Sequence, residues 1–485
     1  MHKTVFALAM VLSCTVFAFG EVAQLTATEK AHFPSSDCSA EAAPQGTTRL
    51  YIALTNGKDG SGASMADARD GSTVTRFDRI LRCYSEGCTE KQSSGAAVAK
   101  TENLIVCLGP GTFWTLGTYD YLIAVPHPNP AGFTIGKGWK IHGSGKDMTV
   151  LKLSDYLPIT DSKNPQNLPV NSGTGLVFGT NSDNAPGIDI SDLTIDGNYP
   201  VLKSRARQNG IKVLTLDAIH LRSDLGGHHI HDVNVINSAA EIGSMSPRWE
   251  AFPIWILSVD RSKPGQDRDN IIENVSMSQS ACVLCTAICV ANATAEVKNN
   301  VVEGVQIGYG GWDLAGGSFH DNTAISTDYG FNIDSLVNNG VNIERNKIIH
   351  PRRFGFVVGG ETTFANFKFL DNTVQIDKSG VVGFVFRGNV TGAVIAGNKV
   401  LADNSSGAHA TAFRNYPATR QSGPNHNNVY QSNQIGNGMS LVFQGSSQKS
   451  QNCFFDNRDE RGNPRKDLPA NAGPCVDDPR NAASH

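Results

Sequence analysis

Asparagines recur at a nearly constant interval through the second half of this chain. Successive positions are separated by 26, 22, 24, 26, 26, 35 and 24 residues, and they are Asn274, Asn300, Asn322, Asn346, Asn372, Asn398, Asn433 and Asn457. A short apolar segment follows many of them, as in Asn346-Lys-Ile-Ile. A period in this range marks stacked repeats. Because the intervening residues alternate with period 2 and lack helical spacing, the repeats are predicted to be coils of a β-solenoid.

Aspartates at Asp192 and Asp232 extend the same pattern upstream, with steps of 40 and 42 residues to the next position. Longer steps predict longer loops, which we place at about 244–251 and 260–269. A further insertion accounts for the 35-residue step before Asn433. Loops carried on a rigid scaffold are common sites of recognition.

The N-terminus has the pattern of an export signal. A positive start at His2-Lys3 precedes an apolar run, and Ala18-Phe19-Gly20 fits a cleavage site, so residues 1–20 are predicted to be a signal peptide. The polar stretch 21–48 is predicted to be a mobile leader. These features predict a secreted or periplasmic protein.

The remaining chain divides into a repeat domain over 49–457 and a polar tail over 458–485. Apolar residues recur at helical spacing over 75–83, which predicts a short helix capping the first coil. A solenoid needs such a cap because its first coil otherwise exposes an unpaired edge.

Composition excludes some classes of partner. The net charge is −4 and no dense stripe of Lys and Arg occurs, so nucleic acid is not an expected partner. After the N-terminal segment, no apolar stretch is long enough to predict a membrane span. We expect a monomer.

The cysteines of an exported protein more often form disulfides than metal sites. Cys83 with Cys88 and Cys453 with Cys475 are the expected local pairs. Cys282 and Cys285 have the spacing of metal ligands, but no second pair accompanies them, and a disulfide or packing is favoured.

Taken together, the asparagine positions, the opening strand with its Asp/Gly-rich turn and the segment Leu193-Thr-Ile-Asp-Gly-Asn198 resemble the pectin-lyase-like proteins of the pectate lyase superfamily. The resemblance covers about residues 48–457. It implies an all-β fold, a right-handed parallel β-helix with a short N-terminal capping helix. It also implies a carbohydrate-active protein whose substrate lies across one parallel sheet.

Outward side chains of that sheet are the predicted site. Strands aligned by their large inward residues give one outward column with His220, Trp255, Asp313 and Asn332, and a second with Arg222, Asp334, Arg387 and Arg414; Glu361 follows its strand. Asp313, Asp334, Arg387 and Arg222 are the predicted catalytic residues. Trp255, Asn332, His220, Glu361 and Arg414 are predicted to bind substrate.

Carboxylates, guanidinium groups and an aromatic ring suit an acidic polysaccharide. An arginine or a bound Ca²⁺ would neutralise a uronate carboxylate while a base removes the neighbouring proton. The leading hypothesis is β-elimination, with hydrolysis or epimerisation next. No certain cofactor and no metal site are assigned, and Ca²⁺ is the one ion considered.

Two observations keep a non-catalytic glycan-binding or surface protein as the alternative. Asn332-Ile-Asp334 resembles the first polygalacturonase signature, but the later ones are absent. His350-Pro-Arg-Arg353 does not fit the pectate lyase signature either. The same Asp and Arg side chains could simply cover a solvated sheet. His229 and His231 share a strand face, but no carboxylate ligand is evident beside them, so a structural role is favoured.

Overall fold

The computed structural model describes most of the repeat domain. The described residues are 35–39, 45–91, 97–118, 132–155, 172–180, 185–210, 213–242, 251–258, 267–278, 285–334, 338–416, 427–443 and 452–467. The predicted signal peptide, most of the predicted loops at about 244–251 and 260–269, and most of the tail lie outside them. Among the described residues, no helix has the length and apolarity that crossing a membrane requires.

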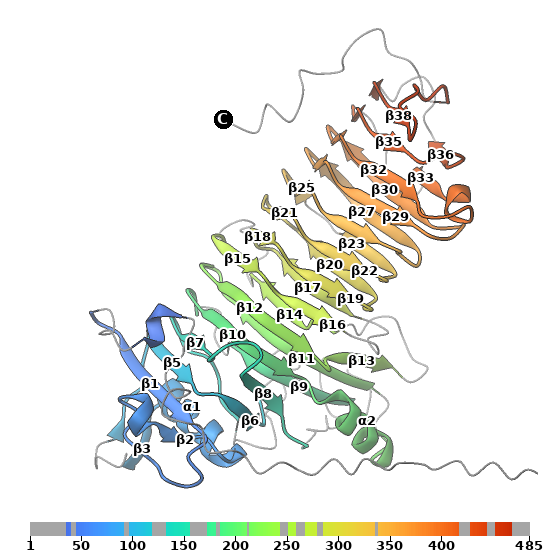
Figure 1. The fold of residues 1–485 in the computed structure, drawn as a ribbon. Helices are drawn as coiled ribbons and strands as arrows, with labels where there is room; N and C mark the ends of the chain where they lie inside the picture. Colours follow the sequence, from blue (N-terminus) through green and yellow to red (C-terminus); the bar gives the residue numbers. More distant parts are fainter. Residues whose placement is uncertain are drawn as a thin grey trace, which may run out of the picture.

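The chain winds through three walls of parallel strands, and the predicted parallel β-helix is confirmed (Figure 1). Wall A contains β5 (Leu104–Leu108), β7 (Lys140–His142), β10 (Asp189–Asp196), β12 (His229–Ile236), β15 (Asn270–Glu273), β18 (Ala295–Lys298), β21 (Ser318–His320), β25 (Asn342–Glu344), β28 (Lys368–Leu370), β31 (Val394–Ala396), β34 (Val429–Gln431) and β37 (Cys453–Phe455).

Wall B meets wall A at a corner that β10 and β12 cross without a break. Its other strands are β6 (Gly111–Thr115), β8 (Thr149–Leu153), β16 (Ser276–Ser278), β19 (Val301–Glu303), β22 (Thr323–Ile325), β26 (Lys347–Ile349), β29 (Thr373–Ile376), β32 (Lys399–Ala402), β35 (Gln434–Ile435) and β38 (Arg458–Asp459).

Wall C is a separate 12-stranded sheet. It contains β9 (Ser172–Gly179), β11 (Val213–Arg222), β13 (Ala239–Ile242), β14 (Ile254–Leu257), β17 (Thr286–Ala291), β20 (Ile307–Trp312), β23 (Tyr329–Asp334), β24 (Asn338–Asn339), β27 (Phe354–Ala365), β30 (Val382–Thr391), β33 (Thr411–Tyr416) and β36 (Ser440–Phe443). Only β13 pairs antiparallel to its neighbour in this sheet.

The first coil is closed by the predicted helix, which is α1 (Val74–Glu86). Thr73 caps its first turn by accepting a hydrogen bond from Arg76 N, and Phe77 packs against Phe113 at 5.4 Å between ring centroids. The remaining elements near this end are η2 (Ser36–Cys38), β1 (Thr48–Ala53), η3 (Met65–Asp67), β2 (Arg69–Asp70), β3 (Cys88–Lys91) and β4 (Ala97–Val98). A second helix, α2 (Tyr199–Gln208), was not predicted, and η5 (Gly407–His409) is a short turn near the far end.

Inward side chains of wall C form a continuous aromatic stack. Consecutive ring centroids lie 4.8, 4.9, 4.7 and 5.1 Å apart along Tyr309, Phe331, Phe356, Phe384 and Phe413. This spacing matches the separation of neighbouring strands. Each ring is buried in the main core, where burial of one large apolar side chain contributes about 1.5–3 kcal/mol.

The asparagine ladder lies buried at the corner between walls A and B. In each rung before the last, Nδ2 donates both to the next asparagine's Oδ1 and to a backbone carbonyl of the preceding coil; Asn372, for example, donates to Asn398 Oδ1 at 3.0 Å and to Ile343 O at 2.7 Å. The rungs are Asn300, Asn322, Asn346, Asn372, Asn398, Asn433 and Asn457. The stack therefore satisfies amides that would otherwise be buried without partners.

Three of the predicted rungs are displaced by one residue. Val275 N donates to Asn300 Oδ1 at 2.9 Å, so Val275 holds the rung position and Asn274 precedes it. Asn274 instead has a left-handed φ of 55°, and Asp192 and Asp232 have φ of 59° and 52°. Asn and Asp tolerate this conformation better than other non-glycine residues. The left-handed corner residue and the rung beside it favour the same residue types, which explains the misalignment.

Disulfides tie down the N-terminal end. Cys83–Cys88 is present as predicted, and Cys38–Cys107 was not predicted. Cys285 and Cys453 are also disulfide-bonded, while Cys282 and Cys475 lie outside the described residues. Cys38–Cys107 anchors residues 35–39, which belong to the segment predicted as a mobile leader. Tyr51 Oη reinforces the anchor by donating to the carbonyl of Cys38 at 3.2 Å.

Candidate functional site

A column of glycines bends the strands of wall C. The glycines precede the strand residues that form the predicted site. A Cβ on Gly330 would approach Gly355 O to 2.6 Å, and one on Gly355 would approach Gly383 O to 2.5 Å. Residues just before these glycines face outward: Tyr329 and Phe354 pack with outward-facing valines rather than with the main core. The bend therefore adds a third outward column, which period-2 alternation did not predict.

Of the predicted substrate-binding residues, His220 and Trp255 are buried. Their exposed fractions are 1% and 6%. His220 Nε2 donates to Phe252 O at 2.9 Å, and burial lowers the pKa of His220 to about 4, so the ring is neutral near pH 7. Trp255 packs against Phe252 with 4.9 Å between centroids. Both side chains support the strand rather than present a surface to sugar.

Asp313 does not lie in the predicted outward column. Strand β20 ends at Trp312, whose partner in the next coil is Asp334, so Trp312 belongs to the column of Asp334. Asp313 follows the strand with a left-handed φ of 53°. Strand β17 is absent from the predicted strand alignment. It places the buried Cys289 and Ala291 between Trp255 and the later coils. Because the residues of β17 are mostly small and all buried, none of them stood out as the large inward residue by which the other strands were aligned.

Register sorts the other predicted residues into two columns. Asn332 shares a column with Val357, Val385 and Arg414, because these positions pair in successive coils. Arg414 is therefore in the first column rather than the second. Within the first column Val357 and Val385 are each 1% exposed, which makes its middle apolar and buried.

The second column keeps most of the polar side chains. It runs from Arg222 through Leu257, Ala291 and Trp312 to Asp334, and continues at Gly359 and Arg387. Asp334 is exposed, while Trp312 and Arg387 are half-buried. Glu361 belongs to β27, and its side chain lies outside the described part of the structure.

Two arginines lie over aromatic rings beside this column. The guanidinium carbon of Arg353 is 5.5 Å from the Tyr329 ring centroid and 5.6 Å from that of Phe354, and the Arg387 guanidinium is 5.7 Å from the Phe354 centroid. Cation–π contact orients a guanidinium without neutralising it. Arg353 was not predicted as a site residue, because the glycine bend that exposes its aromatic partners is a three-dimensional feature.

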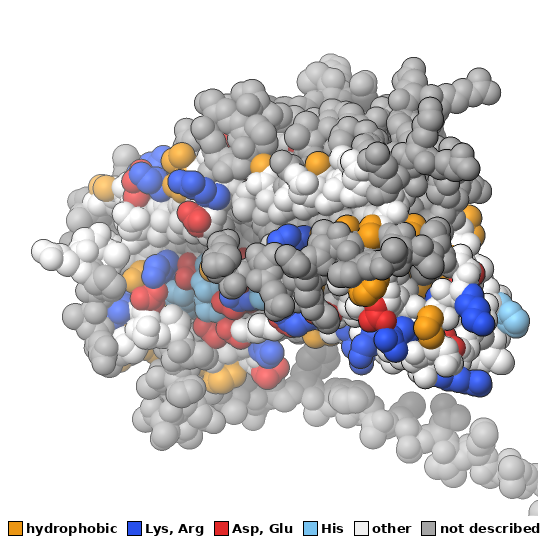
Figure 2. All heavy atoms as spheres, turned by 90° about the horizontal axis from the view of Figure 1, so that it is seen from above, with side chains coloured by type: hydrophobic (Ala, Val, Ile, Leu, Met, Phe, Trp, Pro, Cys, Tyr) orange, Lys and Arg blue, Asp and Glu red, His pale blue; other side chains and the backbone are white. Residues whose placement is uncertain are grey.

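Wall A presents a different outward surface, rich in charged residues and histidine. Figure 2 shows histidine, acidic and basic side chains gathered together on the face that it presents. His229 pairs in register with Asp189 of the previous coil, and the rings of His229 and His231 stack at 4.1 Å. Among the described residues, Asp189, His229 and His231 have ligand-type atoms that all lie within 4.8 Å of one another.

Electrostatics couple the three groups. Burial lowers the pKa of His231, but Asp189 and Asp232 outweigh it and raise the pKa to about 9. Burial raises the pKa of Asp189, yet the neighbouring histidines more than offset it and the net shift is downward. Asp189 is the carboxylate that sequence analysis did not find. The sequence contains the information needed to find it. Asp189 and His229 are separated by the same 40 residues as Asp192 and Asp232, so they occupy equivalent positions in successive coils.

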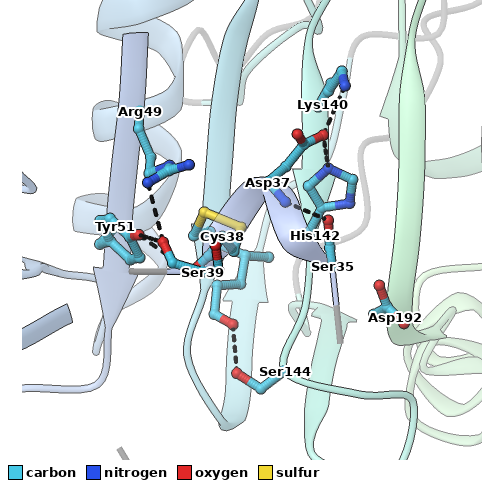
Figure 3. Close-up of a disulfide and its surroundings, with 12 residues drawn as sticks. Ser35, Asp37, Cys38, Ser39, Arg49, Tyr51, Lys140, His142, Ser144 and Asp192 are labelled. Carbon is cyan, nitrogen blue, oxygen red and sulfur yellow. Dashed lines mark hydrogen bonds and ion pairs between the residues drawn. A yellow bond between two sulfur atoms is a disulfide. The ribbon is translucent and has the colours of Figure 1, made fainter. Parts of the chain in front are cut away.

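The anchored N-terminal segment reaches this same wall. Figure 3 shows the Asp37 carboxylate facing Lys140 and His142, close to the Cys38–Cys107 disulfide. Asp37 Oδ2 lies 2.6 Å from Lys140 Nζ and 3.4 Å from His142 Nε2. Burial lowers the pKa of His142 despite the surrounding carboxylates. The segment thus adds a carboxylate to the wall A surface one coil before Asp189.

Comparison with solved structures returns β-helix enzymes. An exopolygalacturonase of Yersinia enterocolitica is 11% identical with a TM-score of 0.48, covering 85% of this chain and 78% of that one. The A-module of mannuronan C-5 epimerase AlgE6 from Azotobacter vinelandii is 11% identical with a TM-score of 0.45, covering 76% and 91%. A rhamnogalacturonan lyase is 12% identical with a TM-score of 0.40, covering 87% and 89%.

No family model and no curated protein matches the sequence. At such low identities the fold assignment rests on the strand registers and the buried ladder described above.

Proposed function

We propose that this protein is exported and acts on an acidic polysaccharide that lies across wall C. The supporting observation is one column. Trp312 pairs with Asp334 and Gly359 pairs with Arg387, and the pairing of Ile333 with Val358 brings the next residues, Asp334 and Gly359, side by side. Gly359 is buried and places no side chain between a carboxylate and a guanidinium whose strands are two spacings, roughly 10 Å, apart. Disulfides at the N-terminal end fit an oxidising compartment.

Each group in this column has a role toward a uronate. Arg387, held over Phe354, offers a fixed positive charge to the sugar carboxylate. Arg353 provides a second cation over the same ring. The half-buried Trp312 takes the place of Trp255 as the aromatic surface for a sugar ring. Asp334 is the exposed carboxylate in position to accept a proton.

β-Elimination is the reaction that we propose for this arrangement. Neutralising the uronate carboxylate acidifies the adjacent C5 proton. Asp334 accepts that proton, the electron pair forms the C4–C5 double bond, and the C4–O glycosidic bond breaks. The departing oxygen is protonated by water. A Ca²⁺ ion bound to the substrate carboxylate would serve the same neutralising purpose, since Ca²⁺ prefers oxygen ligands, and Asp334 would keep its role as the base.

A non-catalytic glycan-binding protein is the second candidate. The observation in its favour is the apolar column beside Asp334, where Cys289, Val357 and Val385 are each at most 1% exposed. That column supplies no general acid next to the carboxylate. Binding alone needs only the arginines and the aromatic surface.

The two candidates separate in a direct assay. The purified full chain is incubated with pectate, alginate and glycosaminoglycans, with added Ca²⁺ or with a chelator, and the ultraviolet absorbance of an unsaturated product is followed. We expect D334N to lower the rate by at least about 100-fold, in the range of a lost acid–base group. R387M should lower kcat/KM by at least about tenfold, since a cation that meets the uronate is removed.

Matched controls lie on wall A and its corner. R345M removes an arginine that pairs with Asp321, and D371N changes a corner aspartate; neither should alter the rate. Binding without any absorbance change or new reducing ends would overturn the catalytic proposal and support the second candidate. Loss of binding in R345M but not in R387M would overturn the placement on wall C.

A further inference from the structure

Asp189, His229 and His231 on wall A form a convergent set of ligand atoms, separate from the proposed polysaccharide surface. Asp189 Oδ1 lies 3.3 Å from His231 Nε2, and Asp189 Oδ2 lies 4.0 Å from His229 Nδ1. Two histidines at alternate positions of β12 point to the same side of the sheet, and strand pairing sets Asp189 beside them. Rigid strands, rather than loops, therefore hold all three groups.

The outer nitrogen of each histidine is engaged by a second carboxylate. His229 Nε2 is 2.8 Å from Glu273 Oε1, and His231 Nδ1 is 2.9 Å from Asp232 Oδ2. Each ring thus directs one nitrogen toward Asp189 and donates its other N–H outward. A carboxylate behind a histidine is the usual support of a metal ligand, because it sets the tautomer and makes the inner nitrogen a better donor.

One oxygen of Asp189 is only weakly engaged by the protein, because it contacts His231 without a well-formed hydrogen bond. Its Oδ1 atom is buried and accepts no hydrogen bond from the described residues, although His231 Nε2 is only 3.3 Å away. A buried carboxylate oxygen without a hydrogen bond needs an explanation. An ion shared with the two histidines would supply the missing partner.

We propose that Asp189, His229 and His231 bind a divalent transition-metal ion of the Zn²⁺ class, with His229 bound through Nδ1 and His231 through Nε2. Bonds of about 2.0–2.1 Å at tetrahedral angles place ligand atoms about 3.3 Å apart. The 3.3 Å separation already meets this value, whereas the 4.0 Å separation and the distance between the two histidine nitrogens, which is within 4.8 Å, require side-chain rotation to close around an ion. Two imidazoles and one carboxylate favour Zn²⁺ or a similar ion over Ca²⁺, which prefers oxygen ligands.

Three protein ligands leave at least one coordination position open. The side chains of His229, His231 and Asp189 are 31%, 21% and 19% exposed, so water or a small anion can complete the coordination. The ion would also cross-link β10 and β12, the two long strands that join walls A and B. Zinc binding should therefore raise the unfolding temperature of the protein, because it favours the folded state.

A neighbouring histidine on the same wall provides the matched control. His320 lies between Asp321 at 2.7 Å and Glu296 at 3.0 Å, so it has two carboxylates like His231. It differs because, within the described part of the chain, no second histidine faces it across the shared carboxylate. An ion-pair network alone would make the two clusters behave alike, whereas a metal site would distinguish them.

Zn²⁺ binding to the full chain is measured by competition with a chromophoric chelator, and the bound ion is located by anomalous scattering in soaked crystals. We expect one ion at Asp189, with affinity reduced at least about 100-fold in H229Q and D189N, about 10–100-fold in E273Q, and unchanged in H320Q. E273Q leaves all three ligands in place, so it remains informative if the ligand variants unfold.

Two results would overturn the proposal. One is wild-type affinity no tighter than that of H229Q, with no rise in unfolding temperature on adding Zn²⁺, which would leave a metal-free ion-pair network. The other is an anomalous peak at His320 or elsewhere but not at Asp189. A visible absorption band on Co²⁺ substitution, lost in D189N, would support the proposed coordination.

Discussion

Coils before and after Asn300 build the same corner in different ways. From Asn300 onward the rung is a buried amide that bonds to the coils on either side. Earlier coils place Leu193, Val233 and Val275 at the equivalent position, each at most 1% exposed. The earlier rungs are 40 and 42 residues apart, whereas most later ones are 22 to 26 apart.

This difference separates a half with coils of regular length from a half with long excursions between coils. An amide rung is satisfied only if the next coil presents another amide at strand distance, so it enforces regular coils. An apolar rung needs only packing, which tolerates long excursions between coils. The Asp189 cluster, α2 and the longest insertions all belong to the earlier half. The regular half provides the surface of Trp312, Asp334 and Arg387.

Removing one amide should break the regular half. In N372A, Ile343 O loses the Asn372 Nδ2 donor, and Asn346 N loses the Oδ1 that it bonds at 3.0 Å. Each unsatisfied buried group costs about 1–3 kcal/mol, so the free energy of unfolding should fall by about 3–5 kcal/mol. Denaturant unfolding followed by circular dichroism measures it.

Asn342 supplies the control for that experiment. It lies half-buried on the outward face of β25, and N342A should change the free energy of unfolding by less than about 0.5 kcal/mol. Equal losses in N372A and N342A would show that the ladder contributes no more than ordinary surface residues.

The early half should also be the more pH-sensitive part. Asp78 on α1 is fully buried, and burial raises its pKa to about 7 despite hydrogen bonds from Thr115 and Leu116. The unfolded value is about 3.9. Between these values the folded state holds a proton that the unfolded state has released, so stability is full below about pH 4 and falls as pH rises toward 7.

The loss is at most about 1.4 kcal/mol per pH unit, a few kcal/mol in total. Thermal unfolding from pH 4 to 8 measures it, and D78N should flatten this slope because the amide does not ionise. A wild-type stability that rises with pH through this window, with the same slope in D78N, would exclude Asp78 as the source.

The period of the repeats was enough to predict architecture, because buried rungs and inward aromatic residues recur wherever coils stack. It was not enough to place side chains around each coil. Asn274 fits the period of the rungs only because the left-handed corner position also favours Asn. Tyr329 and Phe354 share the parity of inward residues, yet the glycine bend turns them outward. Asp189 meets His229 only through strand pairing across 40 residues.

A smaller effect is expected from extending the ladder upstream with V275N. Val275 N already donates to Asn300 Oδ1, so an asparagine there has an acceptor for its Nδ2 in the next coil. Losing a buried valine side chain costs about 1.5–3 kcal/mol, and two new hydrogen bonds return about 1 kcal/mol each. We therefore expect a net loss of at most about 1 kcal/mol in the same denaturant assay, well below that of N372A. A loss as large as in N372A would mean that the early corner cannot accept an amide, and that the two halves differ in backbone geometry as well as in residue type.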